Sequence, residues 1–253
     1  MYKNLAKLYN IYDYKQKGGN PWGDSYESIK KWILELTEPS DVGKIEQVIP
    51  GNMDMSTHLI IIPGFSEDSY TRNLAATSTL NTNLFKSCHY FKFNPQLRGL
   101  STSIVDLIKD GNENAGNLEN MLYIKCSEVI NRILTAEGDS WTVLAKSAGG
   151  GVGICLMKWS DIYKKLYLFA PGIKYLANEN CVYHPLKDNA REFDIIIGWN
   201  YDDTKVPFLN YYPIIHEGFK QCGFRRYELH VYGKDDYKNS EHEINSRFIP
   251  LIQ

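Results

Sequence analysis

The sequence has no long apolar run, no cysteine pair and no large excess of either charge. None of its apolar stretches approaches the ~20 residues that a membrane-spanning helix needs, and its first residues include no apolar signal segment. The five cysteines stand singly, without the C-x-x-C spacing of zinc sites or the pattern of a secreted disulfide framework. We therefore expect a soluble, cytoplasmic protein with reduced cysteines, no metal ion and no membrane span.

The charge is close to balanced, with 28 lysine and arginine residues against 30 aspartate and glutamate residues. A net charge of -2 gives no general attraction to nucleic acid or to an anionic membrane, so neither is an expected partner. The 253 residues, 43% of them apolar, are sufficient for a substantial core, and no linker or internal repeat divides them. We expect one domain over residues 1–253, in which residues 1–57 carry the weakest pattern.

Short segments rich in β-branched and aromatic residues alternate with helical patterns along most of the chain. The expected strands are the segments 58–64, 88–94, 140–145, 165–171, 193–199 and 227–233. Apolar residues recur at helical spacing in 25–36 and 117–134, and the first sixty residues can supply an edge strand with a helix before it. This alternation predicts the α/β class, with a mainly parallel central sheet and helices on both faces.

The segment WTVLAKSAGGGVGICL, residues 141–156, places a serine before a glycine cluster between two apolar stretches. Such a cluster suits either a phosphate-binding loop or a nucleophile on a tight turn between a strand and a helix. The glycines match neither G-x-G-x-x-G nor G-x-x-x-x-G-K-[ST], and the next strand does not end in an acidic ribose ligand. The pattern therefore argues against nucleotide binding, and we expect no cofactor.

Ser147 fits the other possibility, because it lies in a small-x-Ser-x-Gly pentad. Side chains two residues on either side of the serine would collide in so tight a turn, and Ala145 and Gly149 are both small. The pentad alone arises by chance in roughly a quarter of chains of this length. Its place between an apolar strand and an apolar, helix-compatible segment favours a nucleophile over an inert serine in a glycine-rich turn.

Four segments in order along the chain resemble motifs of the α/β-hydrolase superfamily. AKSAGG (145–150) is similar to the nucleophile segment G-H-S-M-G-G, and LIIIPGFSEDS (59–69) resembles the strand and oxyanion turn usually written H-G-F, with Pro63 where histidine is common. NPQLRGLSTS (94–103) resembles the turn D-x-R-G-x-G-x-S, without its aspartate and second glycine. GWNYDDTKVPF (198–208) resembles the acid-bearing turn that ends in D-x-x-V-P.

The resemblance implies a catalytic triad in which an acid and then a histidine follow Ser147 along the chain. Asp203 stands in the D-x-x-V-P register, whereas Asp202 fits if the turn is counted from Gly198, and we prefer Asp203. His242 follows the last expected strand after a polar loop and is expected to begin the final helix, where the family places its catalytic histidine. The alternative for His242 is a surface residue that caps a helix.

The other histidines occupy positions that fit structural roles better. His58 and His89 precede the nucleophile at the starts of strands, and His230 lies inside the apolar segment YELHVY. His184 and His216 come before or within the segment between the acid and the last strand. We therefore expect none of these five to be the catalytic base.

The resemblance also implies an oxyanion hole formed by the backbone N–H groups of Phe65 and Ala148. Ser66 is a further candidate through its hydroxyl, with a turn or helix-cap role as the alternative. Lys146 is unusual beside the serine, and its side chain is either solvated or suited to an anionic group of the substrate.

Together these expectations describe a serine hydrolase that cleaves a small-molecule carboxylic ester through an acyl-enzyme. Only about twenty residues separate LFAPG from the next strand, which leaves little room for a large cap. Two alternatives remain open: a catalytically silent protein of this fold that binds a ligand or a partner protein, and a thioesterase, amidase or peptidase that uses the same triad. The sequence leaves the substrate and the oligomeric state undetermined.

Overall fold

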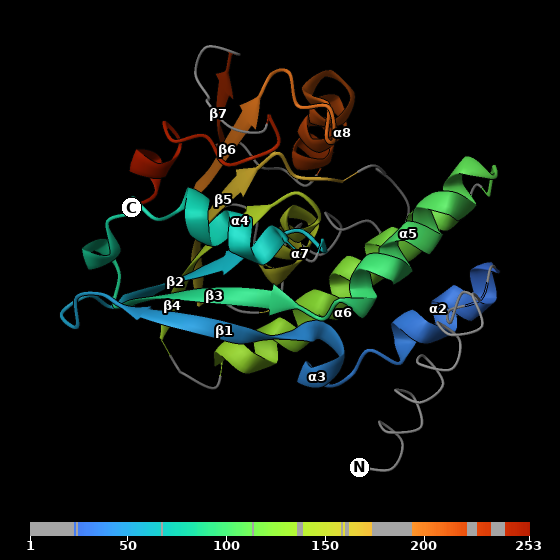
Figure 1. The fold of residues 1–253 in the computed structure, drawn as a ribbon, viewed down its shortest axis with the longest axis horizontal. Coiled ribbons are helices and arrows are strands. Elements are labelled where there is room, and N and C mark those ends of the chain that lie inside the picture. Colours follow the sequence, from blue (N-terminus) through green and yellow to red (C-terminus); the bar gives the residue numbers. More distant parts are fainter. Residues whose placement is uncertain are drawn as a thin grey trace.

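The computed structural model describes residues 23, 25–66, 68–112, 114–135, 139–157, 159, 162–173, 194–221, 227–233 and 241–253. Within these residues, seven strands form one sheet in the order β1-β3-β2-β4-β5-β6-β7 (Figure 1). They are β1 (Gly43–Pro50), β2 (Thr57–Ile62), β3 (Ser87–Phe93), β4 (Ser140–Lys146), β5 (Tyr163–Phe169), β6 (Asp194–Asn200) and β7 (Tyr227–Tyr232). All six strands expected from the sequence are present, and β1 is the edge strand expected from the first sixty residues.

The sheet is parallel from β3 to β7, and only β1 runs antiparallel to its neighbour β3. The prediction of a mainly parallel sheet is therefore confirmed. Because parallel strands end at the same edge, the segments that follow β2, β4 and β6 lie together at one edge of the sheet.

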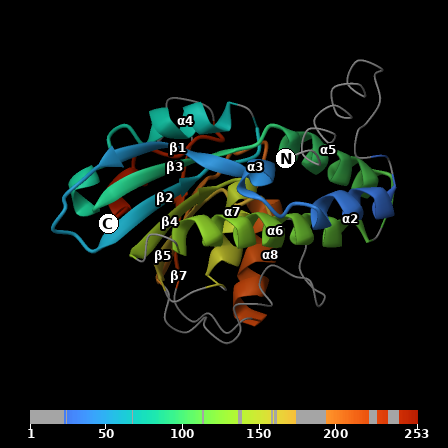
Figure 2. The ribbon, with the colours of Figure 1, turned by 90° about the horizontal axis from the view of Figure 1, so that it is seen from below.

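Helices lie on both sides of this sheet, as predicted. They are α2 (Tyr26–Leu34), α3 (Pro39–Val42), α4 (Ser69–Ala76), α5 (Gln96–Lys109), α6 (Ala115–Thr135), α7 (Ala148–Leu156) and α8 (Phe208–Gln221), with the 3-10 turns η1 (Thr82–Leu84) and η4 (Ile249–Leu251). Figure 2 shows α4 on one side of the sheet and α6 and α7 on the other. None of the helices in the described part of the chain combines the length and apolar character of a membrane span.

Local sequence explains where several of these helices form. Ser25 and Ser28 form a capping box at the start of α2, in which each side chain bonds a backbone N–H of the other residue. The predicted apolar stripe of α6 faces the core, since Leu118, Leu122 and Ile130 are fully buried. Strands β2 and β4 are buried on both faces, as their near-continuous apolar sequences indicate, whereas the edge strands β1 and β7 are partly exposed.

Two local expectations are wrong. The segment that resembles a D-x-R-G-x-G-x-S turn is the beginning of helix α5, because Pro95 precedes its first residue with a helical φ of -54° and the Asn94 side chain accepts from the Gln96 amide. Leu97 and Leu100 then bury the inner face of this helix. His242 does not begin a final helix. It lies in a turn, and within the described residues 241–253 the only helical element is the short η4.

Some expectations concern residues outside the described ranges. These are Cys181, His184, Cys222 and the segment 174–193 between β5 and β6, where a cap would be inserted. Of the other cysteines, Cys88, Cys126 and Cys155 are buried and form no disulfide.

Candidate active site

Ser147 lies on a strained turn between β4 and α7. Its φ of 55° and ψ of -129° place it in the positive-φ region that residues other than glycine rarely adopt. The turn is held on both sides, because the Ser147 amide donates to the Phe169 carbonyl at 3.1 Å and the Ser147 carbonyl accepts from Gly172 at 2.8 Å. The strand, strained serine and helix form the elbow that the sequence predicted.

The small residues around the elbow are required by contacts with neighbouring backbone and side chains. A Cβ atom on Gly149 would overlap the carbonyl oxygen of Pro63, in the turn after β2. A Cβ on Gly153 would lie 2.7 Å from the Cβ of Ala145, so these two positions tolerate only one methyl group between them. The need for small residues at 145 and 149 therefore arises from tertiary packing as well as from the turn itself.

Asp203 and His242 lie in contact although they are far apart in the sequence. The distance from Asp203 Oδ2 to His242 Nδ1 is 2.7 Å. The other carboxylate oxygen, Oδ1, accepts from the backbone N–H groups of Lys205 and Val206, both at 2.9 Å. Asp203 is 2% exposed, whereas Asp202 is exposed at the surface. Of the two candidate acids, Asp203 is the one that these contacts hold against an imidazole.

Asn200 holds the segment that carries His242, and the sequence analysis missed this residue. Its side-chain amide donates at 2.9 Å to the carbonyls of both Glu241 and Glu243, which flank His242, and its carbonyl accepts from Asn245 at 3.1 Å. Asn200 is the last residue of β6 and is fully buried. Because these carbonyls accept from a side chain, the segment is fixed as a turn. The sequence contains one signal for this role, because Asn200 is a polar residue at the end of an otherwise apolar strand.

Ser147 and His242 both line one cavity of about 260 Å³ at the edge of the sheet where the parallel strands end. The described residues that line it are Gly64, Phe65, Ser66, Ser69, Arg72, Ser101, Val105, Glu119, Tyr123, Lys146, Ser147, Ala148, Gly172, Lys205, Val206, Tyr211 and His242. The cavity therefore brings together the turn after β2, the elbow after β4 and the turns after β6 and β7.

The expected oxyanion residues lie beside Ser147. A Cβ atom on Gly64 would be 3.3 Å from the Cβ of Ser147, so the turn after β2 packs directly against the elbow. The Gly64 amide donates to the Ser69 hydroxyl at 2.9 Å, which fixes the turn that carries Phe65. Ala148 is the first residue of α7, and the N–H groups of a first helical turn have no acceptor within their helix. The structure thus brings Phe65 and Ala148 to the wall next to Ser147.

Ser66 lines the cavity but also has a local role. Its carbonyl accepts from the Ser69 amide at 3.0 Å. Burial raises the pKa of the nearby Asp68, but Ser66 and Arg72 outweigh this effect and hold that pKa below its usual value. Ser66 thus takes part in the turn that leads into α4.

Lys146 is not solvated, contrary to the first of the two roles considered for it. Its side chain is 3% exposed, because Lys146 is the last residue of β4 and lies within the sheet between β2 and β5. Burial lowers its pKa to about 8, and the carboxylates of Glu243 and Asp203 oppose this shift. Lys146 therefore places a buried cation at the cavity.

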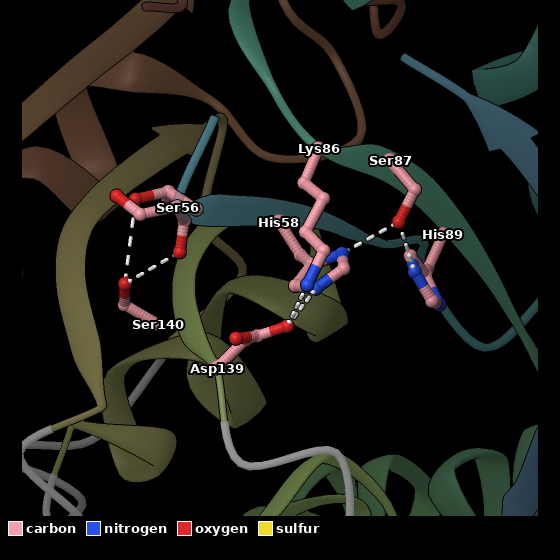
Figure 3. A network of polar contacts seen from close by, with 8 residues as sticks. Ser56, His58, Lys86, Ser87, His89, Asp139 and Ser140 are labelled. Carbon is pink, nitrogen blue, oxygen red and sulfur yellow. Dashed lines mark hydrogen bonds and ion pairs between the residues drawn. The ribbon is translucent and has the colours of Figure 1, made fainter. Parts of the chain in front are cut away.

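His58 and His89 belong to a separate polar network at the opposite edge of the sheet, where β2, β3 and β4 begin (Figure 3). The Ser87 hydroxyl lies 2.5 Å from His58 Nδ1 and 2.6 Å from His89 Nε2. The second nitrogen of His58 lies 2.8 Å from Asp139, which also pairs with Lys86. Ser87 lies in a regular strand and does not line the cavity of Ser147, so this network fits the expected packing role.

The remaining described histidines are also away from the elbow. His230 lies inside β7, the strand formed by the segment YELHVY, with its imidazole 3.4 Å from the Glu228 carboxylate. His216 lies on α8 and bonds the hydroxyl of Tyr227. Neither residue lines the cavity that contains Ser147.

Comparison with solved structures gives matches across most of the chain. The esterase domain of a Rhodothermus marinus protein is 12% identical, with a TM-score of 0.50 over 81% of this chain and 86% of that chain. A protein titled m3DLH is 11% identical, with a TM-score of 0.50 over 81% and 84% of the two chains. The chain has the α/β-hydrolase fold.

A putative dienelactone hydrolase from Klebsiella pneumoniae is also similar, with 12% identity and a TM-score of 0.48 over 79% of this chain and 85% of that chain. No protein-family model and no curated protein sequence matches the chain. At these identities the α/β-hydrolase fold is shared, while activity has to be argued from the residues around Ser147.

Proposed function

We propose that this protein is a serine hydrolase that cleaves a carboxylic ester of a small molecule through an acyl-enzyme. The observation that carries the proposal is the contact of Asp203 with His242, in a segment that shares one cavity with the strained Ser147. A serine hydroxyl needs a base within reach, and the base needs an acid that fixes its tautomer. We further propose that residues 1–253 form one domain that acts in the cytoplasm.

In the first step, the Ser147 oxygen forms a bond to the ester carbonyl carbon, and its proton passes to His242. Asp203 stabilises the imidazolium through the 2.7 Å contact with Nδ1. The backbone N–H groups of Phe65 and Ala148 donate to the oxygen that gains negative charge. The tetrahedral intermediate then collapses, the bond to the alcohol oxygen breaks, and the alcohol leaves with the proton held by His242.

In the second step, water attacks the acyl-enzyme. His242 accepts a proton from the water, the bond between the acyl carbon and Ser147 Oγ breaks, and the serine oxygen takes the proton back. The carboxylic acid product leaves, and the starting state is restored. The same two reaction steps can also cleave a thioester or an amide, since the triad specifies acyl transfer rather than the leaving group.

The test compares Ser147 with Ser87, a second serine that has histidine side chains close to its hydroxyl. A fluorophosphonate probe, followed by mass spectrometry, is expected to label Ser147 in the wild-type protein. Ser147→Ala is expected to lose both the label and the hydrolysis of p-nitrophenyl acetate by several orders of magnitude. Ser87→Ala is the matched control, because Ser87 contacts two histidines but lies outside the cavity.

Undiminished hydrolysis in Ser147→Ala, or labelling of Ser87 instead, contradicts the assignment. A folded wild-type protein that neither reacts with the probe nor hydrolyses the ester would favour the silent binding protein over the hydrolase.

A further inference from the structure

Three cationic side chains line the cavity that contains Ser147. Arg72 comes from α4, Lys146 from the end of β4, and Lys205 from the turn after β6. These residues are distant in the sequence and meet only in the folded chain. Lys146 is buried, Arg72 is partly exposed and Lys205 is exposed, so the three cations differ in their access to solvent.

The cations lie close enough to influence one another. Arg72 and Lys205 both contribute to the lowered pKa of Lys146, after burial, which is the largest cause. Glu243 and Asp203 act in the opposite direction without cancelling the shift. A buried cation is costly unless a group of opposite charge approaches it, so this arrangement favours an anion in the cavity.

The other carboxylates near these cations lie outside the described lining of the cavity. Asp203 is held by His242 and two backbone amides, and Asp68 pairs with Arg72 in an i,i+4 ion pair on α4. Neither Asp203 nor Asp68 is among the described residues that line the cavity, and the same is true of Glu243. Arg72, Lys146 and Lys205 therefore form part of the cavity wall, whereas these three carboxylates do not.

Glu119 is the one carboxylate among the described residues that line the cavity. Glu119 belongs to α6, which lies across the sheet from the α4 helix that carries Arg72 (Figure 2). Burial, followed by the charge of Glu119, raises the pKa of the neighbouring Tyr123, whose hydroxyl donates to the Gly172 carbonyl at 3.0 Å. Among the described lining residues, three cations stand against this one carboxylate, and Asp68 partly offsets the charge of Arg72 from outside the cavity. The modest positive excess that is left suits a monoanionic carboxylate better than a doubly charged phosphate.

We propose that the substrate carries a carboxylate close to its scissile acyl carbon, and that Arg72, Lys146 and Lys205 bind this carboxylate. The carboxylate belongs to the acyl part, since Lys146 adjoins the residue that would hold the acyl group. This inference rests on the proposed hydrolase function and names the substrate class of the same site. A half-ester of a short dicarboxylic acid has the required chemistry.

The hydrolysis test uses two esters of matched length, monoethyl succinate and ethyl pentanoate, with ethanol release as the readout. The expected kcat/KM is about tenfold higher for monoethyl succinate, which corresponds to ~1.4 kcal/mol. Lys205→Met is expected to remove most of this tenfold preference, which is the ratio of kcat/KM for monoethyl succinate to that for ethyl pentanoate. Lys220→Met is the matched control, because Lys220 is also exposed but lies on α8 outside the cavity, and it is expected to keep the ratio.

Salt and pH provide further readouts of the same ratio. Added salt should lower it, because ions screen exposed charges such as Lys205. Lys146 has a pKa of about 8, so it loses its positive charge as the pH rises through that value, and the preference for monoethyl succinate should fall. The groups that face Lys146 are Glu243, Asp203, Arg72 and Lys205, and Lys146→Met is expected to remove this part of the pH dependence.

A binding measurement separates failure of the inference from failure of the hydrolase proposal. Calorimetry with the Ser147→Ala protein is expected to show binding of monoethyl succinate that weakens about tenfold in Ser147→Ala/Lys205→Met. Such binding without any labelling of Ser147 in the wild type would support the anion site and contradict the proposed hydrolase function. Equal hydrolysis of both esters through Ser147, with no binding change in the Lys205 variant, overturns the inference. Tighter binding of inorganic phosphate than of monoethyl succinate also overturns it.

Discussion

The Nδ1 atom of His242 lies 2.7 Å from Oδ2 of Asp203, across 39 residues of sequence. The two residues follow neighbouring parallel strands, β6 and β7, which end at the same edge of the sheet as β4 and its serine elbow. The orientation of Asp203 is fixed independently of the histidine, because its second oxygen accepts from two backbone amides. This relationship leads to the predictions on the acid and the base.

Asp203→Asn is expected to lower turnover of an activated ester by about 10³–10⁴-fold, as loss of the corresponding acid does in serine proteases. The backbone N–H groups keep the side-chain oxygen in place, so the amide nitrogen faces His242 and disfavours the productive tautomer. Asp202→Asn, at the exposed neighbour, is expected to change turnover little. Steady-state kinetics of the two variants test whether Asp203 is the acid. Equal, small losses of turnover in both variants would mean that the acid is another residue.

His242→Asn is expected to remove hydrolysis and to slow labelling of Ser147 by a fluorophosphonate, because the serine loses its base. His230→Asn is the control, since His230 is held inside β7 and does not line the cavity. Any effect of this second change should appear in thermal unfolding rather than in turnover. Normal turnover and labelling in the His242 variant would show that the elbow uses another base.

Asn200→Ala is expected to lower kcat by about tenfold or more while changing KM less, because Asn200 positions the turn that carries His242. The free energy of unfolding should also fall by ~1–3 kcal/mol, since two partly buried carbonyls lose their donor. Asn73→Ala is the matched control. Asn73 is 1% exposed, but its side-chain amide has no hydrogen-bond partner among the described residues. A kcat as low in Asn73→Ala as in Asn200→Ala would contradict the positioning role.

The burial of His89 leads to a prediction of how the free energy of unfolding depends on pH. Burial, followed by the nearby His58, lowers the pKa of His89 from 6.5 to about 4. Between these values the unfolded chain binds one more proton than the folded chain, so this contribution to stability is complete above pH 6.5 and is lost as the pH falls towards 4. The cost is ~1.4 kcal/mol per pH unit.

His89→Gln keeps a polar atom near the Ser87 hydroxyl but does not titrate in this range. Denaturant unfolding at pH 6.5, 5.5 and 4.5 should therefore give a shallower loss of stability in the variant than in the wild type, by up to ~1.4 kcal/mol per pH unit. Parallel losses in the two proteins would show that His89 titrates normally in the folded state.

Much of the α/β-hydrolase fold was predictable because its signals are local. The strands β2, β3, β4, β5, β6 and β7 all coincide with apolar segments read from the sequence, within a few residues at each end. Where a local pattern was overruled, a nearby contact explains the difference. Pro95 and the buried residues of α5 form a helix where the motif resembled a turn, and the Asn200 amide holds a turn where a helix was expected at His242.

The sequence by itself determined that a serine would lie on a tight turn between a strand and a helix, because small residues at 145 and 149 and the flanking apolar segments act over a few residues of chain. Only the tertiary structure decided what surrounds that serine. The choice of Asp203, the hold of Asn200 on the His242 turn and the burial of Lys146 beside Arg72 and Lys205 all depend on segments that meet where parallel strands end. Such contacts depend on strand order and on burial, which no short stretch of sequence specifies.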